Sequence, residues 1–251
     1  MKALRCFLLL LASLATPAPA SPQELTVAAA SDLTFPFKEI GSLFERRFGT
    51  KTTFMFGSTG NLAKQIEHGA PADVFFAADE GFIERLAARG VLVPETQTLY
   101  AQGRIVLAAA KHTGLKLGDL KDLLLAEVRR VAIANPGHAP YGKAAQEALE
   151  RAGLWERVKP KLVYGENIRH ALQLLQTGNV EAGIVALSVA QVPEISYVVL
   201  DASLHTPLRQ AAAVVKRSPR PEMGLAFIKF VTGPEGRPIM KRFGFLLPGE
   251  F

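Results

Sequence analysis

The sequence predicts an α/β protein that consists of two lobes. Short apolar, strand-like runs alternate with amphipathic helical patterns along the chain. The alternation forms two successive strand–helix–strand blocks followed by a tail, so we expect the chain to cross twice between lobes, near 100–103 and 204–210. The predicted first lobe comprises residues 21–102 and 207–251, and the second comprises 103–206. We expect each lobe to contain a mainly parallel sheet flanked by helices.

Residues 1–20 have the pattern of a secretory signal peptide. Two cations precede an apolar stretch at 7–14 that is too short to span a bilayer, and small residues surround an expected cleavage point after Ala20. We therefore expect an exported protein. The single cysteine, Cys6, lies in this segment, so cleavage leaves no disulfide, thiolate nucleophile or cysteine metal site.

The first block contains three expected strands, each followed by a helix. Apolar residues of the first helix fall on one stripe, and glycines close the other two helices. The strands are expected at 25–30, 52–56 and 73–78, and the helices at 35–49, 60–69 and 82–90.

The pattern then restarts and ends in a tail. Strands are expected at 104–110, 130–134, 161–165 and 182–187, with helices at 117–125, 141–153 and 167–178. The tail contains the apolar runs at 195–200 and 208–215 and two helices at 223–231 and 236–244.

Four turns share one form, in which a strand leads through a polar or glycine–proline turn into a helix. They are "AAASDLTFPF", "FGSTGNLAKQ", "IANPGHAPYGKAA" and "VYGENIRHAL". In α/β sheets such turns lie at the carboxyl ends of strands, where ligands bind, and each helix start offers unpaired N–H groups to an anion. Ser31, Ser58, Thr59 and Asn167 add polar groups there, although each residue type is also a common N-cap.

Other chemistries fit these turns poorly. A P-loop needs a lysine at the helix start, and Lys64 comes one turn too late. A serine hydrolase at Ser58 lacks the Gly-x-Ser-x-Gly pattern, and none of the five histidines stands in a recognisable context, so we expect each to be a surface residue. His138 and His170 lack metal-ligand spacing. The net charge of +6 is not gathered into a dense basic block, so we expect no nucleic-acid partner.

The four turns place no Lys or Arg at the very start of a helix. A site of neutral N–H and O–H donors can hold a fully ionised oxyanion, provided that every oxygen is hydrogen-bonded and water is excluded. Two lobes that close on a ligand meet that condition.

From about Glu24 to Pro248 the chain resembles the periplasmic molybdate-binding proteins, the substrate receptors of molybdate ABC importers. The matching stretches are "VAAASDLTFPFKEI", "GSTGNLAKQIEHGAPADVFFAAD", "IANPGHAPYGKAAQEALERAGLWE", "ENIRHALQLLQTGNVEAGIVALS" and "FIKFVTGPEGRPIMKRFGFLLP". The resemblance implies the two-lobe fold of type II periplasmic binding proteins. It also implies a periplasmic, non-enzymatic, cofactor-free monomer that binds molybdate or tungstate and delivers it to a membrane permease. A receptor for sulfate or another oxyanion is the alternative, and a periplasmic serine hydrolase is a remote one.

The resemblance also assigns ligand-binding residues. They are the Ser31 hydroxyl with the Asp32 N–H, the Thr59 hydroxyl with Ser58 adjacent, and the N–H groups of Tyr141 and Ile168. Some family members carry a tyrosine where this chain has Ala186, so we expect the Tyr141 hydroxyl to replace it as a ligand contact. A carboxylate repels a dianion, so we expect the Asp32 side chain to turn away as an N-cap.

Overall fold

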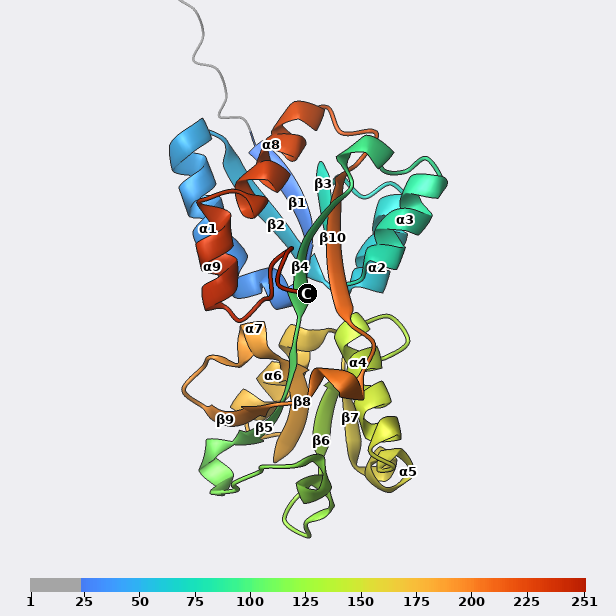
Figure 1. Ribbon diagram of the computed structural model, residues 1–251, viewed down its shortest axis with the longest axis vertical. Helices are drawn as coiled ribbons and strands as arrows, with labels where there is room; N and C mark the ends of the chain where they lie inside the picture. The colour runs from blue at the N-terminus through green and yellow to red at the C-terminus, as the bar shows by residue number, and fades with distance from the viewer. Residues whose placement is uncertain (1–23) are drawn as a thin grey trace, which may run out of the picture.

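The computed structural model describes residues 24–251, and the predicted signal peptide lies outside the described residues. Figure 1 shows two lobes stacked along the long axis, each built around one five-stranded sheet. The two sheets have the orders β2-β1-β3-β10-β4 and β7-β6-β8-β5-β9, and the α/β prediction is confirmed.

The first lobe contains five strands and five helices. The strands are β1 (Glu24–Ala30), β2 (Lys51–Gly57), β3 (Val74–Ala77), β4 (Thr98–Gly103) and β10 (Leu208–Val214). The helices are α1 (Thr34–Phe48), α2 (Thr59–Glu67), α3 (Glu80–Ala88), α8 (Pro221–Thr232) and α9 (Gly236–Arg242). The short 3₁₀ helix η1 (Ser31–Leu33) joins β1 to α1.

The second lobe contains the remaining strands and helices. They are β5 (Ile105–Ala110), β6 (Val131–Ala134), β7 (Leu162–Gly165), β8 (Ala182–Ala186) and β9 (Ile195–Val199), with α4 (Pro140–Arg151), α5 (Trp155–Val158), α6 (Ile168–Gln176) and α7 (Leu187–Ala190). The helix expected at 117–125 is a shorter 3₁₀ helix, Leu120–Leu124.

Each sheet is mixed, with two parallel and two antiparallel pairings, where the sequence predicts mainly parallel ones. β1 pairs in parallel with β2 and β3, whereas β10 is antiparallel to β3 and β4. The second sheet repeats this arrangement with β6 parallel to its neighbours and β5 antiparallel. The reason is that the chain crosses between the lobes. β10 enters from the second lobe and starts at the edge of its sheet where β1 ends, and β5 enters from the first lobe and starts where β6 ends. Each therefore runs opposite to the parallel strands of its sheet.

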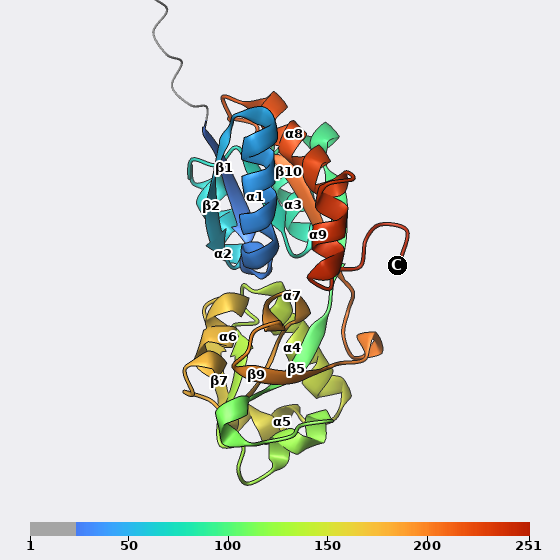
Figure 2. The same cartoon turned by 90° about the vertical axis from the view of Figure 1, so that its left-hand side faces the viewer.

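The crossings are short. Only Arg104 separates β4 from β5, and residues 205–207 lead from the second lobe into β10. Figures 1 and 2 show both connections running side by side between the lobes. The sequence prediction placed the first crossing at 100–103 and missed β4, whose six residues belong to the first sheet.

The first sheet is covered on both faces. Apolar side chains of α1, α8 and α9 form one buried cluster, and those of α2 and α3 form another. The centre of the larger cluster is aromatic: the Phe37 ring packs edge-to-face on Phe76 at 4.9 Å and on Phe227 at 5.6 Å. Such pairs add to the free energy of apolar burial. A rigid core of this kind fixes the strand ends from which the turns project. None of the helices within residues 24–251 has the length and apolar character needed to cross a bilayer.

Candidate oxyanion site between the lobes

The four turns singled out in the sequence converge on one small cavity between the lobes. Ser31 and Asp32 follow β1, Ser58 and Thr59 follow β2, Tyr141 lies in the first turn of α4, and Ile168 begins α6. All six line the cavity. The other lining residues are Ala30, Gly57, Ala78, Ala139 and Pro140. Its volume of about 10 Å³ is close to what one water molecule needs, so the lobes lie against each other around the four turns.

The lining of the cavity contains no Lys, Arg or His. The donors that it offers are neutral N–H and O–H groups, among them those at the starts of two helices. Pro140 is the first residue of α4 and Ile168 the first residue of α6, so the N–H groups of Tyr141 and Ile168 have no partner within their own helices. Unpaired N–H groups at helix starts carry partial positive charge and favour anions.

Thr59 offers a free hydroxyl hydrogen. The N–H of Ala78 donates to Thr59 Oγ1 at 3.0 Å, and the side chain is buried. An oxygen that already accepts from the protein keeps its own hydrogen for another partner. The tertiary structure thus orients this hydroxyl as a donor.

Ser58 and Asn167 differ in their roles. Ser58 occupies the N-cap position of α2 but makes no capping bond, and its Oγ lies 2.8 Å from His138 Nδ1 of the opposite lobe. Asn167 is a true N-cap, since its Oδ1 accepts from the N–H groups of Arg169 and His170.

His138 is only partly exposed and His205 is buried, so the expectation that every histidine lies on the surface is wrong for these two.

Asp32 does not cap a helix, contrary to the sequence prediction. Neither η1 nor α1 has a side-chain cap. Its carboxyl group is fully buried, and Oδ2 accepts from the Tyr141 hydroxyl at 3.0 Å and from Gln210 Nε2 at 2.9 Å. Removal of water by this burial raises the pKa of Asp32 to about 6, although the bonds from Gln210 and Tyr141 and the backbone N–H groups of Asp32 and Leu33 oppose the rise.

The Tyr141 hydroxyl, expected to contact the ligand, is occupied elsewhere. It donates to Asp32 and accepts from Gln210 Nε2 at 2.9 Å. Burial, with the Asp32 charge beside it, raises the pKa of Tyr141 well above its ordinary value. The hydroxyl therefore stays protonated, and its one hydrogen is used within the protein.

The structure adds three residues that the sequence reading missed. Tyr100 donates to Gln210 Oε1 at 2.7 Å and so orients the amide that reaches Asp32. Ser188 of α7 donates to the Asp32 carbonyl at 2.9 Å, from the opposite lobe. Gln210 carried a usable signal, because it is a polar residue inside the apolar run "LRQAAAVV", and it is fully buried.

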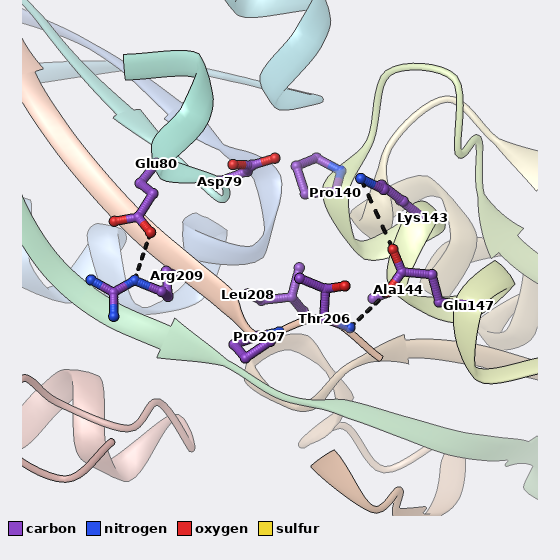
Figure 3. A pocket seen from close by; sticks show the side chains of 10 residues that line it. All are labelled: Asp79, Glu80, Pro140, Lys143, Ala144, Glu147, Thr206, Pro207, Leu208 and Arg209. Carbon is purple, nitrogen blue, oxygen red and sulfur yellow. Dashed lines mark hydrogen bonds and ion pairs between the residues drawn. The ribbon is translucent and has the colours of Figure 1, made fainter. Parts of the chain in front are cut away.

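A second, larger pocket of about 210 Å³ also lies where the lobes meet (Figure 3). Three carboxylates, Asp79, Glu80 and Glu147, outnumber its two cations. Arg209 pairs with Glu80 at 2.6 Å and Lys143 with Glu147 at 4.0 Å. This balance of charge disfavours an anion. Within residues 24–251 no group of three or more His, Cys, Asp or Glu side chains is placed to hold a metal ion.

Two α/β lobes joined by two strands, with a donor-lined cavity between them, define a solute-binding protein. The chain belongs to the family of bacterial extracellular solute-binding proteins, whose model matches residues 25–246. It is similar to the molybdate-binding protein ModA of Rhodobacter capsulatus, with 35% identity over 91% of this chain and 90% of the relative. ModA of Azotobacter vinelandii is 36% identical over 90% of this chain and 91% of its own.

The solved structures agree with the sequence relatives. The Azotobacter vinelandii periplasmic molybdate-binding protein superposes with a TM-score of 0.84 at 29% identity, over 89% of this chain and 99% of that chain. The two-lobe fold is thereby confirmed, and these relatives are binding proteins, not enzymes. The Ser58–His138 pair, which superficially resembles a hydrolase dyad, is a contact between lobes.

Proposed function

We propose that this protein captures molybdate, and also tungstate, in the cavity lined by Ser31, Asp32, Ser58, Thr59, Tyr141 and Ile168. The observation that carries the proposal is a lining contributed by both lobes that offers O–H and N–H donors and no cation, with Asp32 as the one Asp or Glu in it. Such a lining suits a compact, fully ionised tetrahedral oxyanion, because each oxygen meets O–H or N–H groups. The similarity to molybdate-binding relatives supports the choice of ligand. We include tungstate as a ligand because it has the same shape and charge as molybdate.

The proposal includes the route of the ligand. Export through the signal peptide at 1–20 would place the protein outside the cytoplasm, where it hands the anion to the membrane permease of an ABC importer. The lobes, assigned as 21–102 with 207–251 and 103–206, close on the anion because the closed form makes contacts that the open form lacks. We infer that a single chain carries out this capture.

A thermal-shift titration tests the ligand. The chain from Ser21 onward is heated with molybdate, tungstate, sulfate or phosphate at equal concentrations. A ligand that binds only the folded state stabilises it by about 4 kcal/mol at a thousandfold excess over its dissociation constant, which raises the midpoint by several degrees. We expect shifts with molybdate and tungstate alone. A shift with sulfate and none with molybdate contradicts the proposal and favours a sulfate receptor.

A further inference from the structure

One atom of Asp32 lacks a partner. Within residues 24–251, Oδ1 of Asp32 is the single buried side-chain N or O atom with no hydrogen bond. The residue has no exposed surface and lines the proposed oxyanion cavity. Tyr141 and Gln210 both bind the other oxygen, Oδ2. Since buried polar atoms are nearly always paired, the free oxygen indicates a partner that comes from outside the protein.

The charge of the carboxyl group decides which partner fits. An ionised Oδ1 can only accept, so it requires a ligand that still carries a proton. A protonated Oδ1 is a donor, so it requires a fully ionised ligand oxygen. The two alternatives differ in electrostatics, because an ionised carboxylate and a dianion in one small cavity repel each other strongly.

None of the side chains that bond to the Asp32 carboxyl group is a cation that would offset that repulsion. They are the hydroxyl of Tyr141 from α4 and the amide of Gln210 from β10, with Tyr100 of β4 behind that amide. The backbone N–H groups of Asp32 and Leu33 also favour the ionised form, but they carry no full charge, and the hydroxyl of Ser188 from α7 bonds the Asp32 backbone carbonyl instead. Arg169 at the start of α6 is directed elsewhere: its guanidinium lies over the Phe35 ring at 4.7 Å and donates to Gln176. The neutral acid is therefore the favoured form beside a dianion.

We propose that Asp32 binds the oxyanion as a neutral carboxylic acid that donates a hydrogen bond from Oδ1, so that capture of one dianion takes up one proton. This inference rests on the proposed function and deepens it. The proton comes from solvent and returns to solvent on release, and no bond of the oxyanion changes. Tyr141 and Gln210 make Oδ2 the accepting end of the group, which leaves the proton on Oδ1.

The pKa of Asp32 agrees with this role. Burial raises it to about 6 against the hydrogen bonds that oppose the rise. A dianion in contact raises it further, because a nearby negative charge favours the protonated form. Affinity should then fall by up to about tenfold per pH unit between the pKa of the free protein and that of the complex.

Calorimetry of molybdate binding at pH 6, 7 and 8, in buffers of different ionisation enthalpy, tests the proposal without any variant. We expect the dissociation constant to rise at least about tenfold from pH 6 to pH 8. The buffer dependence should show proton uptake approaching one per anion at the higher pH. Binding that is independent of pH and takes up no proton overturns the inference and leaves the proposed function standing.

The variant Asp32→Asn sharpens the test, because its amide oxygen still accepts from Tyr141 and Gln210 while its NH₂ is a permanent donor. We expect its affinity to be independent of pH, to exceed that of the native protein at pH 8, and to involve no proton uptake. Glu95→Gln, an exposed change in the same lobe, removes one negative charge and should behave as the native protein does.

Two further outcomes overturn the proposal. Binding of phosphate by the native protein that Asp32→Asn abolishes would show an ionised Asp32 that accepts from a protonated oxyanion. Failure of both proteins to bind molybdate at any pH would overturn this inference and the proposed function together.

Discussion

Nδ1 of His138 lies 2.8 Å from Oγ of Ser58, and the two residues belong to opposite lobes. The backbone of the same histidine makes a second contact, since its carbonyl accepts from the N–H of Gly60 at 2.9 Å. One loop of the second lobe thus holds the start of α2 by a side-chain and a backbone hydrogen bond. These contacts exist only when the lobes are together, so they stabilise the closed form.

His138→Ala should weaken oxyanion binding modestly. The substitution removes the Ser58 contact but keeps the backbone carbonyl, and a typical hydrogen bond contributes about 0.5–1.5 kcal/mol. We expect the dissociation constant for molybdate to rise about threefold to tenfold, measured by calorimetry. His112→Ala, at an exposed site of the same lobe, is the control and should change nothing. Equal affinities of the His138 variant and the native protein would contradict the role of this contact.

Gly60→Ala should block closure without unfolding the protein. A Cβ at this position would lie 2.8 Å from the His138 carbonyl oxygen, which is closer than such atoms approach, and 3.1 Å from its Cα, which is tighter than most such contacts. Overpacking of this kind costs about 1–3 kcal/mol, so affinity should fall by about fivefold to a hundredfold. The unliganded unfolding midpoint should stay near the native one, because the clash exists only in the closed form.

Gly118→Ala is the matched control for that experiment. Its Cβ would meet one atom, Asp122 Oδ2, at 4.0 Å, which is ordinary contact. A Gly60 variant with native affinity would show that the lobes bind the anion without approaching as closely as the structure shows.

Thr59→Val should lose both affinity and stability. Valine has no hydroxyl to donate to the anion, and hydrogen bonds to charged groups contribute about 1.5–3 kcal/mol, so we expect a loss of about ten- to a hundredfold. The N–H of Ala78 also loses its acceptor, which lowers the free energy of unfolding by about 1–3 kcal/mol. Thr59→Ser keeps both hydrogen bonds and should stay close to native in calorimetry and in urea unfolding. If Thr59→Ser loses as much affinity and stability as Thr59→Val, the loss does not come from the missing hydroxyl group.

Asp32 should make closure of the empty protein depend on pH. Its pKa is about 6 in the closed structure against an ordinary 3.8. Because the closed form holds the proton more tightly, ionisation of Asp32 does not oppose closure below about pH 3.8. The free-energy cost of closure grows as the pH rises from about 3.8 to about 6, and above about pH 6 it has its full value. It amounts to at most about 3 kcal/mol, the value for a carboxyl group that has its ordinary pKa in the open form, since one pKa unit corresponds to about 1.4 kcal/mol.

Small-angle X-ray scattering of the empty protein can detect this effect. We expect the radius of gyration of the native protein to increase from pH 5 to pH 7.5, and that of Asp32→Asn to stay small at both values. A native protein whose dimensions do not change with pH would contradict the coupling between Asp32 and closure. This measurement uses no ligand, so it is independent of the calorimetry.

The local chemistry of the chain was sufficient to predict much of this protein. The alternation of apolar strands and amphipathic helices follows from short-range periodicity, and the polar turns at strand ends follow from the residues that helix starts prefer. Both are properties of neighbouring residues. They also singled out Ser31, Ser58 and Thr59, which line the cavity between the lobes, because the residues at a helix start lie close together in the sequence.

The tertiary structure decided what those stretches do. Gln210 reaches Asp32 across 178 positions of sequence, Tyr141 across 109, and His138 reaches Ser58 across 80. No local pattern encodes such pairings, so the capping role expected of the Asp32 side chain was wrong, and the Tyr141 hydroxyl bonds to Asp32 and Gln210. The antiparallel direction of β5 and β10 likewise follows only from how the chain passes between lobes. The sequence by itself determined the elements and the donor turns, and the meeting of the two lobes decided which donors are free and that one carboxyl group is buried among them.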